Sequence, residues 1–199
     1  MPPVLDLQID AAFHGPRQVL GAFDLHVDRG EVLAVCGPSG VGKSTLLRII
    51  AGLHAEFRGH RRVNGRLAMV FQEPTLLPWR NALDNIRLLA GCSAKDAEAH
   101  LAEVGLEGRG GDTPNRLSLG QQRRLSLARA VAARPDLLLL DEPFVSLDED
   151  LVEGMMDLVA GLRDRHGFGA ILVTHAPVEA ARLAQRILRL DGSPAVPVT

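Results

Sequence analysis

Hydrophobic and polar residues alternate in two segments near the start of the chain, Leu5–Ile9 and Phe23–Val27. Strict alternation is typical of strands with one buried face, so we predict two half-buried, antiparallel strands and a turn at Arg29-Gly30. A further pair of strands is expected on either side of Asn64-Gly65, because this dipeptide is a strong hairpin signal. Together these strands would form a small antiparallel β-lobe.

Five short runs farther along the chain are hydrophobic at every position, except for Arg189 in the last run, rather than at every second one. Such runs are typical of strands buried on both faces of a parallel sheet, and segments with helical spacing of leucine, methionine or valine separate most of them. The runs span residues 32–36, 67–71, 137–140, 170–173 and 187–190. Strands that alternate with helices predict an α/β fold with a mostly parallel sheet.

Residues 75–133 contain no such run and are predicted to form a helical insertion between strands of the sheet. A first helix is capped by Asn81, a second starts near Ser93, and a third opens at Leu117–Gln121 and ends at Arg134-Pro135. With 199 residues the chain is expected to be a single domain. We divide it into a β-lobe and core over 1–74, a helical subdomain over 75–133, core over 134–190 and a mobile tail over 191–199.

One stretch between a buried strand and a helical segment carries specific chemistry. Residues 37–45 fit the pattern G-x-x-x-x-G-K-[ST], in which glycines let successive backbone N–H groups point at phosphate oxygens. Lys43 can reach the β- and γ-phosphates of a nucleotide, and the Ser44 hydroxyl can ligate Mg²⁺. The predicted nucleotide-binding residues are Gly37, Pro38, Ser39, Gly40, Val41, Gly42, Lys43, Ser44 and Thr45.

Composition narrows the function further. The chain has 20 arginines and only two lysines, so Lys43 stands where a compact ammonium group is wanted. A net charge of −2 gives no electrostatic reason to expect nucleic acid as a partner. No hydrophobic run approaches the ~20 residues that span a bilayer, and the start lacks the features of a signal peptide, so a cytoplasmic protein is expected. The two cysteines are too few for a disulfide framework.

Four polar residues follow directly on predicted strands. In an open parallel sheet, ligands bind beyond the carboxyl ends of the strands, so these side chains would converge on the mouth that holds the phosphate-binding loop. Each has an ordinary alternative as a helix cap, a loop polar group or a surface residue, but an array of all four around one such loop favours a catalytic site. They are Gln72, Asp141, Glu142 and His175.

With these motifs in this order, the chain resembles the nucleotide-binding subunit of ABC transporters from Leu5 to Leu190. That resemblance implies a P-loop NTPase fold with a RecA-like core. The matching segments are residues 37–45 for Walker A, Gln72 for the Q-loop, 117–125 for the signature, 137–142 for Walker B and its glutamate, 146–148 for the D-loop, and His175 for the switch histidine.

The resemblance also implies roles for these residues in binding and hydrolysing ATP. Ser44 and Gln72 would ligate Mg²⁺, and Asp141 would hold the metal through a water molecule. Glu142 would polarise the attacking water, while His175 would bind the γ-phosphate, which makes Glu142, His175 and Gln72 the expected catalytic residues. In the ATP-bound state two subunits would form a homodimer, each site being completed by the partner through Ser118, Gly120, Gln121 and Asp148.

Two positions fit the family pattern less closely. Phe13 falls roughly where the family's base-stacking aromatic lies, although a core phenylalanine is an equal alternative. Leu119 replaces the first glycine of the signature Leu-Ser-Gly-Gly-Gln. A side chain there would strain the backbone if φ were positive, and with ordinary φ it would still crowd the partner's nucleotide. A working but weakened ATP-bound dimer is expected.

Three kinds of protein share the phosphate-binding loop. The sequence favours an energy-coupling subunit for a separate integral-membrane permease over a soluble ABC ATPase acting on DNA or ribosomes, and over a P-loop kinase. Residues 71–79 resemble the Q-loop region of importer ATPases for nitrate, sulfonate, taurine and thiamine precursors. We therefore expect an importer subunit, peripheral on the inner face of the cell membrane, that contacts its permease around Leu76, Leu77, Trp79 and Arg80.

Overall fold

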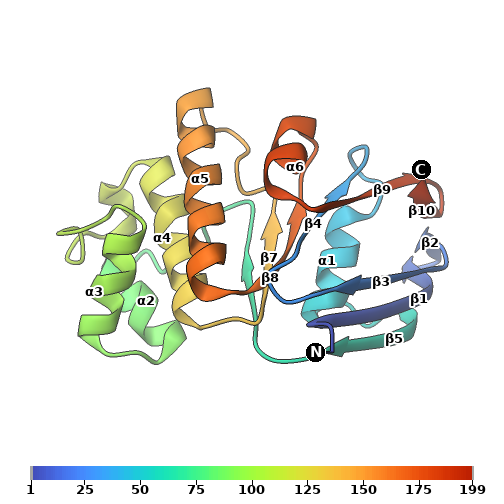
Figure 1. Ribbon diagram of the computed structural model, residues 1–199, viewed down its shortest axis with the longest axis horizontal. Helices are drawn as coiled ribbons and strands as arrows, with labels where there is room; N and C mark the ends of the chain where they lie inside the picture. The colour runs from blue at the N-terminus through green and yellow to red at the C-terminus, as the bar shows by residue number, and fades with distance from the viewer. Residues whose placement is uncertain (1, 199) are drawn as a thin grey trace.

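The computed structural model describes residues 2–198, and their strands form a single curled sheet (Figure 1). The strand order is β3-β1-β2-β10-β9-β4-β8-β7-β6, and β5 pairs with β1 off this path. Helices of the insertion lie at one end of the molecule and the β-lobe at the other, with the parallel strands between them (Figure 1). No helix between residues 2 and 198 is long and apolar enough to cross a membrane.

Five strands form the predicted parallel part of the sheet. Its faces are both covered, because alternate residues of one strand enter different hydrophobic cores: Leu138 and Leu140 pack with the insertion and α5, and Leu137 and Leu139 with α1 and the β-lobe. This explains why four of the five runs are hydrophobic at every position, while the run at residues 187–190 contains Arg189. The strands, in spatial order, are β9 (Arg186–Gly192), β4 (Val32–Cys36), β8 (Gly169–Val173), β7 (Leu137–Asp141) and β6 (Leu67–Val70).

The antiparallel β-lobe is confirmed, but one of its predicted turns is wrong. Its strands are β1 (Leu5–His14), β2 (Arg17–Leu20), β3 (Phe23–Val27) and β5 (Phe57–Val63), and β1 pairs antiparallel with the other three. Asn64-Gly65 does not close a hairpin, because β5 pairs with β1 whereas β6 pairs with β7. Asn64 instead donates from Nδ2 to the Pro3 carbonyl at 2.7 Å. The dipeptide lies in the connection from β5 of the lobe to β6 of the core.

The first two helices of the insertion begin where the sequence predicts. Asn81 and Ser93 cap α2 (Ala82–Ala90) and α3 (Ala94–Glu103), each accepting a hydrogen bond from a backbone N–H of the first turn. A 3₁₀ turn, η1 (Pro114–Arg116), precedes α4 (Leu119–Ala132). The remaining helices belong to the core: α1 (Lys43–Ala51), α5 (Glu149–His166), which ends at Gly167, and α6 (Pro177–Leu183).

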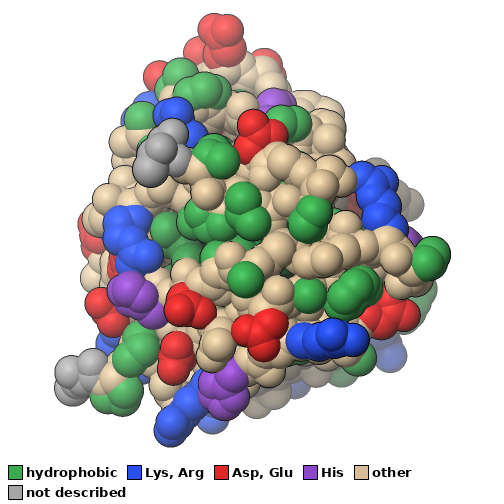
Figure 2. Space-filling model, turned by 90° about the vertical axis from the view of Figure 1, so that its right-hand side faces the viewer, with side chains coloured by type: hydrophobic (Ala, Val, Ile, Leu, Met, Phe, Trp, Pro, Cys, Tyr) green, Lys and Arg blue, Asp and Glu red, His purple; other side chains and the backbone are tan. Residues whose placement is uncertain are grey.

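The predicted mobile tail is wrong for residues 191–198. β10 (Ala195–Val198) folds back antiparallel on β9, and Ala195 is fully buried and also bridges to Leu20 of β2. Two prolines suggested a disordered end, but Pro194 lies in the turn and Pro197 lies within the paired strand β10. The hairpin therefore links the parallel core to the β-lobe. Figure 2 views the molecule from the right-hand side of Figure 1, where hydrophobic side chains lie in the middle of the face and charged ones around them.

Candidate functional site

The register of the parallel strands aligns the ends from which the predicted site residues emerge. Val70, Leu140, Leu172 and Ala34 occupy one row across β6, β7, β8 and β4. The chain leaves each strand shortly after this row, so the side chains that follow meet at one edge of the sheet. The residues two or three positions beyond the row are Gln72, Glu142, His175 and Gly37.

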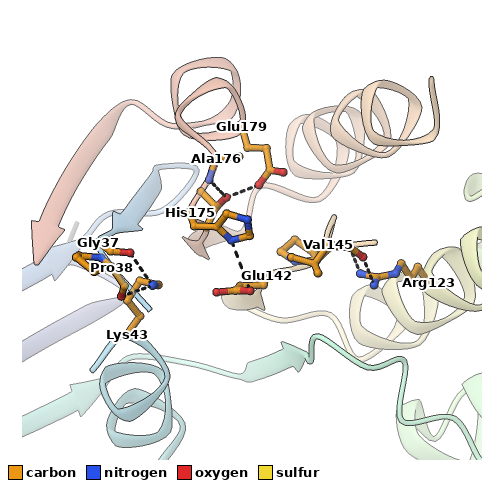
Figure 3. A network of polar contacts seen from close by, with 11 residues as sticks. Gly37, Pro38, Lys43, Arg123, Glu142, Val145, His175, Ala176 and Glu179 are labelled. Carbon is orange, nitrogen blue, oxygen red and sulfur yellow. Dashed lines mark hydrogen bonds and ion pairs between the residues drawn. The ribbon is translucent and has the colours of Figure 1, made fainter. Parts of the chain in front are cut away.

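The phosphate-binding loop surrounds a hollow of about 360 Å³ at the start of α1. Lys43 is 5% exposed, and its Nζ donates to the carbonyls of Gly37 at 2.7 Å and Pro38 at 2.9 Å, so the ammonium group is held against the loop (Figure 3). Gly42 has φ 116°, and a Cβ there would lie 2.8 Å from Cδ2 of Leu20. Only glycine allows the loop to turn this close to β2.

Glu142 lies where this hollow meets a larger one of about 820 Å³ that contains His175. Its Oε2 is 3.7 Å from Nδ1 of His175, and the two side chains point toward each other from the ends of neighbouring strands (Figure 3). Glu142 has φ 45°, a left-handed conformation that is costly for a side chain, and its N–H donates to the Val173 carbonyl at 3.0 Å. The fold thus holds the Glu142 backbone in an unfavourable conformation, with its side chain beside the phosphate-binding loop.

Three oxygen-bearing side chains are the predicted ligands of a magnesium ion. Ser44 lines the smaller hollow, Asp141 ends β7, and Gln72 comes shortly after β6, the strand that pairs with β7. Burial and the negative charge of Glu142 both raise the pKa of Asp141, while Arg48 and Lys43 lower it. A divalent cation would relieve the first two effects, and hydroxyl, amide and carboxylate oxygens are the ligands such a hard cation prefers.

Sequence reasoning missed several polar neighbours of these residues. His14 and Arg17 line the smaller hollow from β1 and β2, and Arg48 lines it from α1. Glu179, in the first turn of α6, accepts a hydrogen bond from the Thr174 hydroxyl, and that hydroxyl also accepts one from the Ala176 N–H at 2.9 Å (Figure 3). Burial is the main reason that the pKa of Glu179 is raised. The Thr-His-Ala-Pro sequence before a helix was the available signal.

The signature residues lie apart from the phosphate-binding loop of the same chain. Ser118 caps α4 and forms a capping box with Gln121, whose N–H donates to Ser118 Oγ at 3.3 Å. Asp148 caps α5 by accepting from the Leu151 N–H at 3.0 Å. None of the predicted partner-facing residues lines either hollow of the described chain; these residues are Ser118, Gly120, Gln121 and Asp148.

Two buried arginines of α4 connect the signature helix to the segments that follow Glu142 and Gln72. Arg123 donates from Nη1 to the Pro143 carbonyl at 2.5 Å and from Nη2 to the Val145 carbonyl, both just beyond Glu142 (Figure 3). Arg129 donates to the Pro74 carbonyl at 3.2 Å and the Thr75 carbonyl at 2.9 Å, just beyond Gln72. The helix that starts at the signature therefore holds the segments after both residues.

Phe13 is not brought to the phosphate-binding loop. Its ring lies 5.6 Å below the guanidinium carbon of Arg58, and it lines a separate shallow hollow on the β-lobe with residues 55–58. Its neighbour His14 lines the nucleotide hollow instead, because successive residues of a strand point to opposite faces.

Leu119 occupies the first position of α4, with helical backbone and no positive φ. The strain expected for a positive φ at this position is therefore absent. Its side chain is 43% exposed, which leaves the steric argument as the one to test.

Known proteins of the same construction show where this chain belongs. A family profile described as "ABC transporter" matches residues 20–145. The aliphatic sulfonates import ATP-binding protein SsuB 2 of Burkholderia cenocepacia is 42% identical over 97% of this chain and 76% of its own length. SsuB of Mycobacterium avium is 45% identical over 90% of this chain and 74% of its own length.

A solved structure agrees with these sequence relatives. The dimeric post-hydrolysis state of the ATP-binding cassette MJ0796, bound to ADP and Pi, superposes with a TM-score of 0.80 at 28% identity and covers 93% of each chain. The predicted α/β fold with a P-loop core is confirmed by this likeness. The profile match over more than half of the residues, together with these relatives, shows that the chain belongs to the ABC transporter family as one of its ATP-hydrolysing subunits.

Proposed function

We propose that this subunit hydrolyses ATP with Mg²⁺ to power solute import through a separate integral-membrane permease. The observation that carries the proposal is the single sheet edge that brings together the phosphate-binding loop, Glu142 and His175. The relatives named as import ATP-binding proteins support the direction of transport, and their names make aliphatic sulfonates the candidate solutes. The alternative is a soluble ABC ATPase without a transport partner.

Positioning and charge neutralisation account for most of the catalysis in such a site. The backbone of residues 37–42 and the start of α1 would hold the β- and γ-phosphates, and Lys43 would leave the loop carbonyls to contact them. Glu142 would accept a proton from the water that attacks the γ-phosphorus, giving ADP and inorganic phosphate. His175, 3.7 Å from that carboxylate, would bind the γ-phosphate and detect its release.

Magnesium would neutralise charge on the phosphates during this reaction. Ser44 and Gln72 would be its ligands, and Asp141 would hold it through a water molecule. The raised pKa of Asp141 supports this assignment, because a nearby divalent cation would keep the half-buried carboxylate ionised.

The second half of each site would come from another copy of the chain. Ser118 and Gly120 start α4, where first-turn N–H groups have no partners within the helix and can bind an anion. Because these residues lie away from their own phosphate-binding loop, they would contact the γ-phosphate held by a partner subunit, as the dimeric cassette suggests. ATP would then hold the homodimer together.

The permease would dock on the loop before α2. Trp79 is 73% exposed, yet the loop that carries it is fixed, because the fully buried Asn85 accepts from the Leu77 N–H and donates to the Leu77 and Arg80 carbonyls. Arg129 fixes the other side of this loop, close to Gln72. A permease contact at Trp79 could therefore reposition Gln72 through a short, rigid connection.

Uptake measurements test the proposal. A strain lacking this chain should lose most uptake of a radiolabelled alkanesulfonate, and the wild-type chain should restore it while Glu142→Gln does not. Purified chain should hydrolyse ATP only when Mg²⁺ is supplied. Normal uptake of alkanesulfonates in the deleted strain would exclude them as the solutes; normal uptake of every solute in a panel, and no membrane protein copurifying with the chain, would favour the non-transport ATPase.

A further inference from the structure

A cluster of metal-ligating side chains joins the ends of two helices far from the nucleotide hollows. His100 and Glu103 lie in the last turn of α3, and His166 is the last residue of α5. Glu103 contacts both histidines: its Oε2 lies 2.8 Å from Nδ1 of His100, and its Oε1 lies 3.2 Å from Nε2 of His166. We propose that this cluster binds Zn²⁺ or a similar divalent transition-metal ion.

The donor atoms of the three side chains already lie close together. One nitrogen from each histidine and one carboxylate oxygen lie within 4.8 Å of one another. Ligands bound to zinc at ~2.0–2.1 Å in a tetrahedral arrangement are separated by about 3.3 Å, so modest rotation of the rings would close the remaining gap. Two histidines, one glutamate and a water molecule make a common zinc coordination set. The ion would lie between the nitrogens and the carboxylate in place of the imidazole N–H hydrogens, whose hydrogen bonds Glu103 otherwise accepts.

The helix ends favour a cation at this place. α3 and α5 have 10 and 18 residues, and both point their C-terminal dipole ends, which are negative, at the cluster. The three side chains are between 15% and 26% exposed, so an ion can enter from solvent but is partly shielded once bound.

Three arginines act against binding and set its strength. Arg165 Nε lies 3.7 Å from Glu103 Oε1. Arg29 and Arg134 line the open hollow that both histidines of the cluster also line. Asp136 also lines it and offsets part of this charge through its ion pair with Arg29. A bound ion must displace Arg165 from the carboxylate, so the affinity should be lower than that of an enclosed structural zinc site and strongly dependent on pH.

The site would connect the helical insertion directly to the core. α3 packs on α2 and α4, whereas α5 packs on α4 and α6 and lies between α4 and α6 in Figure 1. An ion held by His100, Glu103 and His166 would link α3 to α5 without passing through α4. It would therefore restrict movement of the insertion, which carries the signature residues, relative to the core.

Metal titration of the whole chain tests this site. Untagged protein stripped with EDTA would be titrated with Zn²⁺ by calorimetry, without nucleotide and with excess Mg²⁺ to occupy oxygen sites. We expect one ion per chain, and at least tenfold weaker binding in His100→Gln, Glu103→Gln and His166→Gln. Glutamine keeps the side chains polar, and circular dichroism would verify folding. His60→Gln, on the exposed face of β5, is the matched control and should bind like wild type.

Two further measurements identify the ligands and the link. Co²⁺ should give the intense visible bands of a four-coordinate site without thiolate charge transfer, which excludes Cys36 and Cys92 as ligands. Zn²⁺ should slow amide hydrogen exchange at the end of α3 in wild type and not in His166→Gln, a partly exposed position where loss of folding is not expected. Substoichiometric binding, or equal binding by wild type and all three variants, would overturn the proposal and leave the cluster as a hydrogen-bond network.

Discussion

The phosphate-binding loop and the signature segment are built in opposite ways, although both start a helix. The loop lies against the core: Lys43 is almost completely buried, and the helix behind it is anchored by Leu46, Leu47, Ile49 and Ile50, none of which is exposed. The signature segment lies at the surface. Ser118 accepts a hydrogen bond from a first-turn N–H of its own helix in a capping box, and Leu119 is exposed. The phosphate-binding loop is a preformed receptor for phosphate, whereas the signature segment is a surface that has no ligand in its own subunit.

In the proposed homodimer, a single chain would therefore contain a complete set of site residues but only half of each site. The receptor is held by packing, so it can be preorganised before ATP arrives. The signature is held to the same chain by Arg123 and Arg129, whose hydrogen bonds end on the segments beyond Glu142 and Gln72. If the signature segment closed around a partner's nucleotide, the movement would therefore be transmitted to the segments that follow Glu142 and Gln72.

The largest expected effect separates hydrolysis from binding. Glu142→Gln should lower turnover by about 10²–10⁴-fold, the usual contribution of a general base, while ATP affinity stays near wild type. With the receptor intact and hydrolysis blocked, ATP should drive dimerisation, measured by sedimentation. Lys43→Ala is the contrasting variant, since losing a charge-assisted contact of roughly 1.5–3 kcal/mol should weaken ATP binding itself. Wild-type turnover in Glu142→Gln would remove this residue from the mechanism.

The next effect concerns the exposed side of the molecule. Trp79→Ala should weaken association with the permease by about 30-fold, because a buried interface tryptophan contributes ~2 kcal/mol or more. ATP affinity should not change, since Trp79 lines neither hollow near the nucleotide. Leu88→Ala is the matched control for lost surface hydrophobicity, because Leu88 is an exposed apolar residue of the following helix α2. Equal loss of ATP binding and permease binding would mean that Trp79 supports the fold rather than a partner.

A smaller effect should appear where the two regions are connected. Arg123 holds the carbonyls of residues 143 and 145, between Glu142 and Ser146, both of which have positive φ. Arg123→Gln should release this costly conformation and lower kcat by about tenfold, which corresponds to ~1.4 kcal/mol, with little change in KM. Arg124→Gln is the matched control, because Arg124 donates to the Val104 carbonyl, away from the site. A change in KM without loss of kcat would contradict a positioning role.

The contrast also explains which features were predictable from the sequence. The P-loop, the buried strands, the cap at Asn81 and the helix starts near Ser93 and within residues 117–121 depend on local patterns, and the structure has them as predicted. Two failures involve long-range pairing: Asn64-Gly65 joins strands that pair elsewhere, and the tail is ordered by β9 and β2. The placement of Phe13 failed for a local reason, because it faces away from the side of β1 on which His14 lines the nucleotide hollow. Likewise, the buried Arg123 is indistinguishable in sequence from the partly exposed Arg124, because its partners lie about 20 residues away.

The smallest effect tests whether the signature surface is tuned by its leucine. Leu119 has helical backbone, so replacing it relieves no positive-φ strain, and the remaining argument is steric. Its isobutyl group is 43% exposed at the start of α4, beside the Ser118 and Gly120 groups that would face the partner's γ-phosphate. Glycine would open this surface but would also cost about 1 kcal/mol at a helical position. In the Glu142→Gln background we therefore expect Leu119→Gly to tighten ATP-driven dimerisation only a few-fold, with Leu119→Ala, which keeps helix propensity, tightening it more. Sedimentation across ATP concentrations would measure both, and weaker dimerisation in the alanine variant would show that Leu119 makes a favourable contact across the dimer.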